Sequence, residues 1–188
     1  PAAALPSARC ARELAQDLGK PLRAQAAAKW GMTAYFCGDH AGLLAAESEG
    51  RHLLDASPAE VAADIRAGGS GVLVPFACVA ALAEHFVEAE RAFLTGIDEA
   101  ERAGAVTAAA TLTVPYALML LRTKVAESIP VADRLLAVAD LVPLAEPFAR
   151  VVRSYAFLEQ DEEEQSSREW DLAHAGVSEF RIWMGGCW

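Results

Sequence analysis

Apolar residues recur at intervals of three and four positions along most of the chain, which is the period of an amphipathic α-helix. The longest such run covers residues 72–95, where one helical face is apolar and the other carries charges. Its apolar positions are Val79, Leu82, Phe86, Ala89 and Phe93. Strict alternation between hairpin turns, the pattern of strands, is absent from the sequence. The pattern therefore predicts an all-α, single-domain compact array of about eight short-to-medium helices.

Capping residues predict one helix in detail. In the segment DASPAEVAADIRAGG, residues 55–69, Ser57 is placed to cap the N-terminus and Pro58 takes the first helical position. Glu60 follows three residues after the cap, as in a capping box. The glycines at 68–69 are expected to end this helix and to act as a plain hinge.

Other boundaries follow from single residues. The first helix is expected to begin after Ser7, and Asp39 to cap a short helix. Gly96 is expected to break the run of residues 72–95, and Pro130 to precede the helix that follows the uncharged segment.

Residues 104–121 carry no charge for eighteen positions, which is close to the lower limit for a membrane span. Three threonines and Pro115 interrupt the segment, and no aromatic residues flank both of its ends. These features favour a buried central helix and make a membrane-spanning helix the weaker alternative, so a membrane is not an expected partner.

An acidic run, EQDEEE at residues 159–164, is predicted to separate the helical domain from the C-terminal tail. Five carboxylates in six positions repel one another and favour an extended or solvated segment. The expected division is a helical domain at 1–158, an acidic linker at 159–168, and a short helix with an aromatic C-terminal tail at 169–188. That short helix is expected to end at Gly176.

The net charge of the chain indicates which kinds of macromolecule it can bind. The chain has 26 Asp plus Glu against 16 Lys plus Arg, a formal net charge of −10. Such a surface repels phosphate backbones and anionic lipids, so the sequence predicts no nucleic-acid partner. It suits a basic protein partner.

The cysteines Cys10, Cys37, Cys78 and Cys187 form no CxxC pair and no zinc-binding spacing. The start of the chain, PAAALPSARC, lacks the basic and leucine-rich regions of a signal peptide. Reduced thiols and a cytoplasmic location are therefore the expectation.

Motifs of catalysis and of cofactor binding do not appear in the sequence. His85 with Glu88, and Asp171 with His174, share the spacing of metal ligands, but the paired Glu-x-x-His pattern is missing. The sequence thus predicts no metal and no cofactor, and it favours a protein that is not an enzyme. A pocket between helices near Trp30, Tyr35, Tyr116 and Met119 is the alternative binding site.

The C-terminal tail is unusually apolar. Burying one indole contributes about 2–3 kcal/mol, so these side chains are expected to need an acceptor groove. The groove is sought in the same chain, in a second subunit or in a partner. The tail residues proposed for binding are Phe180, Trp183, Met184, Cys187 and Trp188.

Three functional hypotheses follow. The leading one is a non-catalytic helical protein-binding protein with an acidic surface, acting as an adaptor, chaperone or inhibitor. The first alternative is a small-molecule-binding protein or enzyme with a pocket between helices. The second alternative is a recognition domain whose C-terminal peptide is modified in trans.

Overall fold

The computed structural model describes the backbone of residues 4–184 and the side chains of residues 4–176. Within these residues the chain forms ten α-helices and one short 3₁₀ turn, with no strand, so the all-α prediction is confirmed. The expected count of about eight helices is not confirmed.

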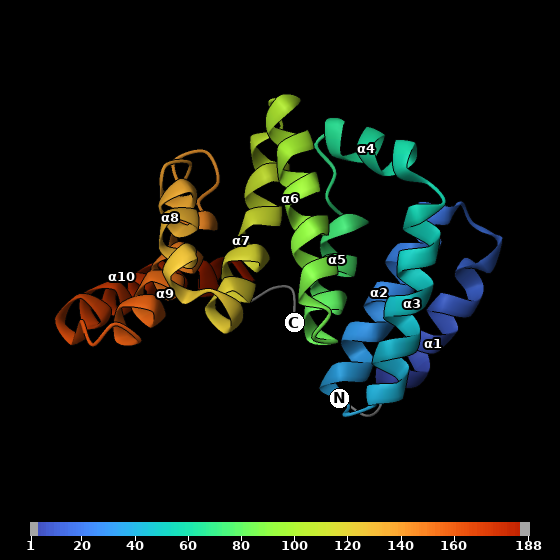
Figure 1. Ribbon diagram of the computed structural model, residues 1–188, viewed down its shortest axis with the longest axis horizontal. Coiled ribbons are helices and arrows are strands. Elements are labelled where there is room, and N and C mark those ends of the chain that lie inside the picture. Colours follow the sequence, from blue (N-terminus) through green and yellow to red (C-terminus); the bar gives the residue numbers. More distant parts are fainter. Residues whose placement is uncertain (1–3, 185–188) are drawn as a thin grey trace. The chain divides into compact units, whose positions relative to one another are not determined.

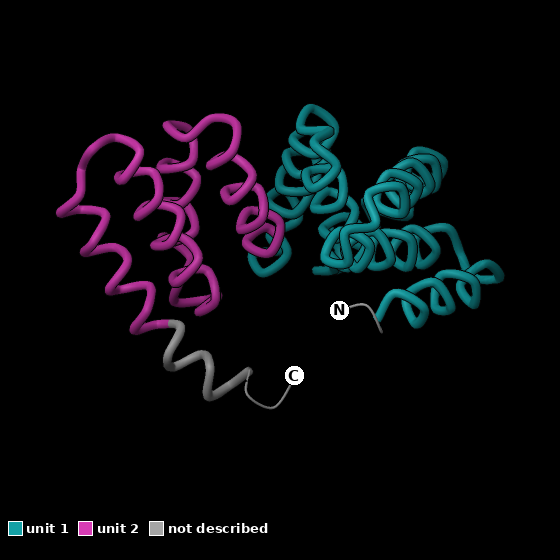
Figure 2. The backbone as a smooth tube through the Cα atoms, turned by 90° about the horizontal axis from the view of Figure 1, so that it is seen from below, with its two compact units in different colours: residues 1–108 teal, residues 109–188 magenta. Residues whose placement is uncertain are grey.

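Two compact units divide the chain, unit 1 at residues 1–108 and unit 2 at residues 109–188 (Figure 2). The helices of unit 1 are α1 (Ala4–Leu14), α2 (Lys20–Phe36), α3 (His40–Asp55), α4 (Pro58–Arg66), α5 (Leu73–Leu82) and α6 (Phe86–Arg102), with the 3₁₀ turn η1 (Ala15–Asp17) after α1 (Figure 1). Unit 2 contains most of α7 (Val106–Thr123), then α8 (Val125–Leu136), α9 (Ala145–Leu158) and α10 (Glu163–Met184). The boundary between the units along the chain therefore falls within α7, and the expected division at residues 158 and 168 stays a prediction.

In unit 1, α2 and α3 form a helical hairpin (Figure 1). Gly38 makes the turn with φ at 73°, and the Asp39 carboxylate accepts a hydrogen bond from the Gly42 backbone N–H at 2.9 Å. The predicted cap at Asp39 is confirmed, although α3 is longer than expected. This backbone hydrogen bond lowers the pKa of the Asp39 carboxyl, and the Arg9 guanidinium at 2.9 Å acts in the same direction.

Small residues allow α2, α3 and α5 to approach one another closely. A Cβ added to Gly31 of α2 would lie 2.8 Å from the Ala46 Cβ of α3 and 3.1 Å from a Val79 methyl of α5. Buried alanines fill the same layer, namely Ala24, Ala27, Ala28, Ala34, Ala77 and Ala80. The alanines of this layer thus serve close helix packing.

The run of residues 72–95, predicted as one helix, forms parts of two. α5 ends at Leu82, and Glu84 takes a left-handed backbone with φ at 63°. The backbone N–H of His85 then donates to the Ala80 carbonyl at 2.9 Å, which closes the end of α5. Gly96, predicted to break the run, is buried inside α6. Apolar periodicity was continuous across this break because both helices face the same core.

Of two predicted N-caps, Ser57 takes the N-cap position without the side-chain hydrogen bond, and the cap at Ser7 is wrong. The helix α4 begins at Pro58 as expected, but the Ser57 hydroxyl donates to the Leu53 carbonyl at 2.7 Å and does not cap it. The helix α1 begins at Ala4, before Ser7. Pro6 is tolerated in its first turn, because backbone N–H groups at that position make no hydrogen bond within the helix. The expected end of α4 is confirmed, since Gly68 takes φ at 85°.

Prolines lie inside two helices of this chain. Pro115 is within α7, and Pro130 lies within α8 where a boundary was predicted. The break occurs instead at Lys124, whose backbone has φ −150° and ψ 64°. By length and composition α7 is apolar enough to cross a membrane, and 44% of it is buried in the structure.

In unit 2, α9 packs against both α8 and α10. The core that α8 and α9 share with α7 is made of small and branched side chains: Ala110, Ala117, Ala132, Leu135, Ala145, Ala149 and Val152. The acidic run connects α9 to α10 by a turn, with Asp161 at φ 59° and the Glu162 backbone N–H donating to the Phe157 carbonyl at 2.9 Å. Most of its side chains are exposed as expected, but residues 163–168 are helical and not an extended linker.

The helix α10 does not end at Gly176 as predicted, but continues to Met184. A Cβ added to Gly176 would lie 3.5 Å from the Pro147 Cβ of α9, an ordinary van der Waals distance. A glycine needs no left-handed backbone here, so it permits the helix to continue.

A charged network fastens α8, α9 and α10 together. Glu169 of α10, 8% exposed, accepts hydrogen bonds from Arg150 and Arg153 of α9, each at 3.0 Å. Arg150 also pairs with Glu146, and Arg153 pairs with Asp133 of α8. Burial lowers the pKa of Arg150, but the hydrogen bonds and charges of the two glutamates outweigh it and raise the pKa above its ordinary value. Arg150 therefore stays charged at any pH at which the protein folds.

Glu169→Gln is expected to destabilise the protein by about 1–3 kcal/mol, because two partly buried guanidinium groups lose their anion. Glu146→Gln removes the same charge from a half-exposed carboxylate and should change the free energy of unfolding by less than about 0.5 kcal/mol. Urea unfolding measures both, and equal effects would contradict the structural role of Glu169.

Two glycine substitutions are expected to have opposite signs. Gly31→Ala should destabilise by about 1–3 kcal/mol because its methyl group collides with Ala46 and Val79. Gly176→Ala should stabilise by about 0.5–1 kcal/mol, since the methyl group fits and alanine favours the helix. Thermal unfolding of both variants tests this, and a stabilising Gly31→Ala would refute the close packing of α2, α3 and α5.

Candidate functional site

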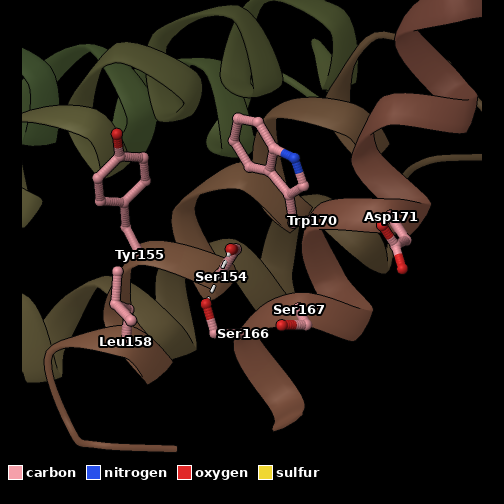
Figure 3. A pocket seen from close by; sticks show the side chains of 7 residues that line it. All are labelled: Ser154, Tyr155, Leu158, Ser166, Ser167, Trp170 and Asp171. Carbon is pink, nitrogen blue, oxygen red and sulfur yellow. Dashed lines mark hydrogen bonds between the residues drawn. The ribbon is translucent and has the colours of Figure 1, made fainter. Parts of the chain in front are cut away.

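A cavity of about 320 Å³ lies between α9 and α10 in unit 2 (Figure 3). We call it the α9–α10 groove. Its lining residues are Ser154, Tyr155, Leu158, Ser166, Ser167, Trp170 and Asp171. All seven side chains come from two adjacent helices, so their placement depends on how α9 and α10 pack.

The floor of the groove is polar and internally satisfied. Ser154 and Ser166 are both buried, and their hydroxyl oxygens lie 3.2 Å apart in a hydrogen bond across the helix pair. Each hydroxyl has its partner in the other helix, so the floor does not demand a ligand.

The walls of the groove are apolar and open to solvent. Figure 3 shows the rings of Tyr155 and Trp170 on the same side of the two helices, with Leu158 next to Tyr155. Tyr155 is 52% exposed, Trp170 is 50% exposed and Leu158 is 51% exposed. Large apolar side chains that gather while half exposed mark interaction surfaces more often than single exposed ones do.

The exposed wall belongs to a second apolar stripe on α9. One stripe, which contains Ala149, Val152 and Ala156, is buried in unit 2. A separate stripe follows i, i+3, i+7 and i+10 and points outward; it consists of Phe148, Val151, Tyr155 and Leu158. We call it the outer stripe of α9.

Arginines occupy the side of α9 opposite the outer stripe. At about 100° per residue, Tyr155 stands about 200° around the helix from Arg153. The ion pairs of Arg150 and Arg153 with Glu169 therefore hold α9 against α10 on one side, while Tyr155 and Leu158 of the outer stripe stay about half exposed.

The rim of the groove is negatively charged. Asp171 lines it, and the acidic turn begins at Glu159, directly after Leu158. Within the described side chains no ion pair involves any of these carboxylates: Glu159, Asp161, Glu162, Glu163, Glu164 and Asp171. Arg168, exposed on α10, is the nearby cation of this segment, so the acidic turn and Asp171 together leave an excess of negative charge beside the groove.

Unit 1 contains a second cavity of about 290 Å³ bounded by α3, α4, α5 and α6. Its floor is apolar, with Leu54, Ile65 and Phe76. Its rim carries both signs of charge, from Arg51, Asp55, Glu88, Arg91 and Glu99. A rim of mixed charge does not select one charge class of ligand, so this cavity is the weaker candidate.

Glu47 is a buried carboxylate of α3, with an exposed fraction of 1%. It lies one helical turn before Arg51, which lines the second cavity. Its Oε2 lies 3.3 Å from the His85 Nδ1 and 3.4 Å from Arg51, while its Oε1 has no hydrogen-bond partner among the described residues. The Arg51 and His85 side chains are both more than a third exposed, so solvent screens these two contacts.

The four residues predicted to line a pocket do not line either cavity. Trp30 is buried under the Arg12 guanidinium, 4.6 Å from its ring centroid, and Tyr35 meets the edge of Phe36. Tyr116 and Met119 are buried on α7. Trp30 and Tyr35 belong to unit 1 and the other two to unit 2, so a pocket at these four positions stays a prediction.

The predicted tail site lies outside the described side chains. It comprises Phe180, Trp183, Met184, Cys187 and Trp188, and its docking in cis or in trans stays a prediction. Among residues 4–176 no group of three or more His, Cys, Asp or Glu side chains is placed to hold a metal ion.

Comparison with known proteins assigns no family, since no protein-family model, no curated protein and no solved structure matches the chain.

The α9–α10 groove was not predicted from the sequence, although one signal for it was present. The outer stripe is visible as apolar positions in residues 148–158, but a single helix cannot show which of its two apolar stripes is buried. Trp170 carried no such signal, because its neighbours are polar.

The cysteines outside the tail are expected to differ in reactivity. Burial raises the pKa of the Cys78 thiol from 9.0 to about 11, whereas Cys10 is exposed. Below pH 9 the thiolate fraction of Cys78 is about a hundredfold lower than that of an ordinary thiol, so its alkylation by iodoacetamide should be slower by at least that factor. Peptide mapping by mass spectrometry at pH 8 measures both rates, and similar rates would mean that α5 opens readily.

Proposed function

We propose that this chain is a non-catalytic helical protein-binding protein, acting as an adaptor, chaperone or inhibitor, whose α9–α10 groove takes a basic amphipathic segment of a partner. The observation that carries the proposal is the half-exposed outer stripe of α9, which lies beside carboxylates that have no ion-pair partner in the described chain. Apolar area gives such a site its affinity, and charge gives it orientation and selectivity.

The apolar part of the surface supports binding of useful strength. Covering the exposed half of an aromatic side chain buries on the order of 100 Å², which is worth about 2–3 kcal/mol. Tyr155 and Trp170 therefore resemble the aromatic residues that dominate protein interfaces, while Leu158 and Phe148 extend the contact along α9.

The charge supports the choice of partner. A net charge of −10, Asp171 in the lining of the groove and the acidic turn that follows Leu158 favour an approaching cation and disfavour an acidic surface. An amphipathic helix with an apolar face and basic flanks satisfies both features, because it places its apolar residues against the outer stripe of α9 and its cations against the acidic turn.

Binding of a designed peptide tests the proposal. The probe is a fluorescent helical peptide of about 18 residues, or about five turns, with leucines on one face and lysines plus one central arginine on the flanks. Its binding, followed by fluorescence anisotropy, should weaken at high salt, and Tyr155→Ala or Trp170→Ala should each weaken it by about tenfold.

Tyr35→Ala is the matched control, because Tyr35 is an aromatic residue of unit 1 that is 44% exposed and lies outside the groove. It should leave peptide affinity unchanged. Equal binding of a charge-reversed peptide with glutamates, or insensitivity to Tyr155→Ala and Trp170→Ala, would refute the proposed function.

A further inference from the structure

Unit 1 presents exposed apolar side chains at the connection between α1 and α2 (Figure 1). Leu14 and Leu18 bound the 3₁₀ turn η1, and Leu22 lies in the first turn of α2. The Arg23 guanidinium donates to the Gln16 side-chain oxygen at 3.0 Å, which ties η1 to α2. The three leucines are 75%, 50% and 50% exposed, in that order, and we call them the leucine surface. Apolar side chains exposed together at one turn mark an interaction surface more often than single ones do.

Three cations near the leucine surface lack a carboxylate partner. Lys20, the first residue of α2, donates to a backbone carbonyl at 3.2 Å, and the buried Arg23 Nε has no hydrogen-bond partner among the described residues. Lys29 is exposed seven residues after Leu22, on the same face of α2. No ion pair involves any of these cations within the described side chains. Their charges therefore remain available to a partner.

The surroundings of the leucine surface are basic, unlike the chain as a whole. Residues 1–38 contain five of the 16 Lys and Arg residues but only two of the 26 Asp and Glu residues, Glu13 and Asp17. Residues 159–168, which form the acidic turn and the start of α10, contain five carboxylates and one cation, Arg168. The two segments thus carry net charges of opposite sign.

The α9–α10 groove and the leucine surface complement each other. The groove exposes Tyr155, Leu158 and Trp170 by about half and adjoins the acidic turn. The leucine surface exposes apolar side chains by half or more and adjoins the cations of α2. Apolar area gives such a contact its affinity, while charges of opposite sign orient it and disfavour other partners. The chain therefore contains both halves of the contact that the proposed function requires.

We propose that the leucine surface of one copy of this chain docks into the α9–α10 groove of a second copy. The inference rests on the proposed function and names a partner that supplies the basic apolar segment. The contact joins two different surfaces, so it is head-to-tail and not symmetric. A dimer formed in this way keeps one free groove and one free leucine surface, so association continues with rising concentration until a ring closes.

Two double variants of the full chain test the contact from its two sides. Leu14→Ser with Leu18→Ser removes most of the leucine surface and keeps the groove, whereas Tyr155→Ala with Trp170→Ala removes the groove walls and keeps the leucine surface. Both alter exposed side chains, so both variants should fold. In sedimentation velocity, the wild-type chain should associate with rising concentration, and each double variant should associate at least about tenfold more weakly.

Mixing the two double variants gives the sharpest result. The first variant has only an intact groove and the second only an intact leucine surface, so an equimolar mixture should form a one-to-one complex and stop there. Leu141→Ser is the matched control, because Leu141 is 71% exposed and lies outside both the groove and the leucine surface. It should leave the association of the wild-type chain unchanged.

The outcomes separate this inference from the proposed function. If the chain stays monomeric while the basic peptide binds the groove, the second-copy contact is refuted and the proposed function stands. Double variants that associate as strongly as the wild type, or that fail to combine when mixed, refute the contact as well. So does a monomeric chain whose binding to phosphatidylserine vesicles is abolished by Leu14→Ser with Leu18→Ser, since the leucine surface then serves a membrane. If the groove binds neither the peptide nor a second copy, both proposals fail.

Discussion

The carboxylate of Glu169, held between two arginines of α9, is the interaction on which the functional surface of unit 2 depends. Because Arg150 and Arg153 lie on one side of α9, satisfying them against α10 determines which way that helix faces. A charged pair that is largely removed from water tolerates little misalignment, so the network also holds α9 and α10 in register. The outer stripe of α9 is then directed away from the network and left at the surface.

Unit 1 achieves its packing by different means. The closest contacts between α2, α3 and α5 are made by alanines and by Gly31, beside larger buried side chains such as Leu43, Phe76 and Val79. Each small side chain gains little hydrophobic free energy, but close approach of the helices adds dispersion contacts. Aromatic residues form only 7% of the chain, so the exposed aromatic pair of unit 2 is not explained by a surplus of them.

The acidic residues 159–164 act differently in a turn than they would in an extended linker. As part of an extended linker, residues 159–164 would only separate two segments. In the structure they form the turn between α9 and α10 and the start of α10, at the end of the groove that carries Leu158. Negative charge at the N-terminus of α10 also complements the helix dipole. The same residues therefore stabilise a helix end and give the neighbouring groove its sign of charge.

Local features of the amino-acid sequence were sufficient to predict four properties. These are the all-α class, the cap at Asp39, the start of α4 at Pro58 and the sign of the net charge. These depend on residue type and on spacing within one or two turns, which a sequence displays directly. The break at Glu84, the helical course through Pro130 and the continuation of α10 past Gly176 were decided by backbone geometry and packing. The groove belongs to this second class, because α9 has two apolar stripes. Only its pairing with α8 and α10 determines that Val152 is buried while Tyr155 remains exposed, with Trp170 lining the same groove.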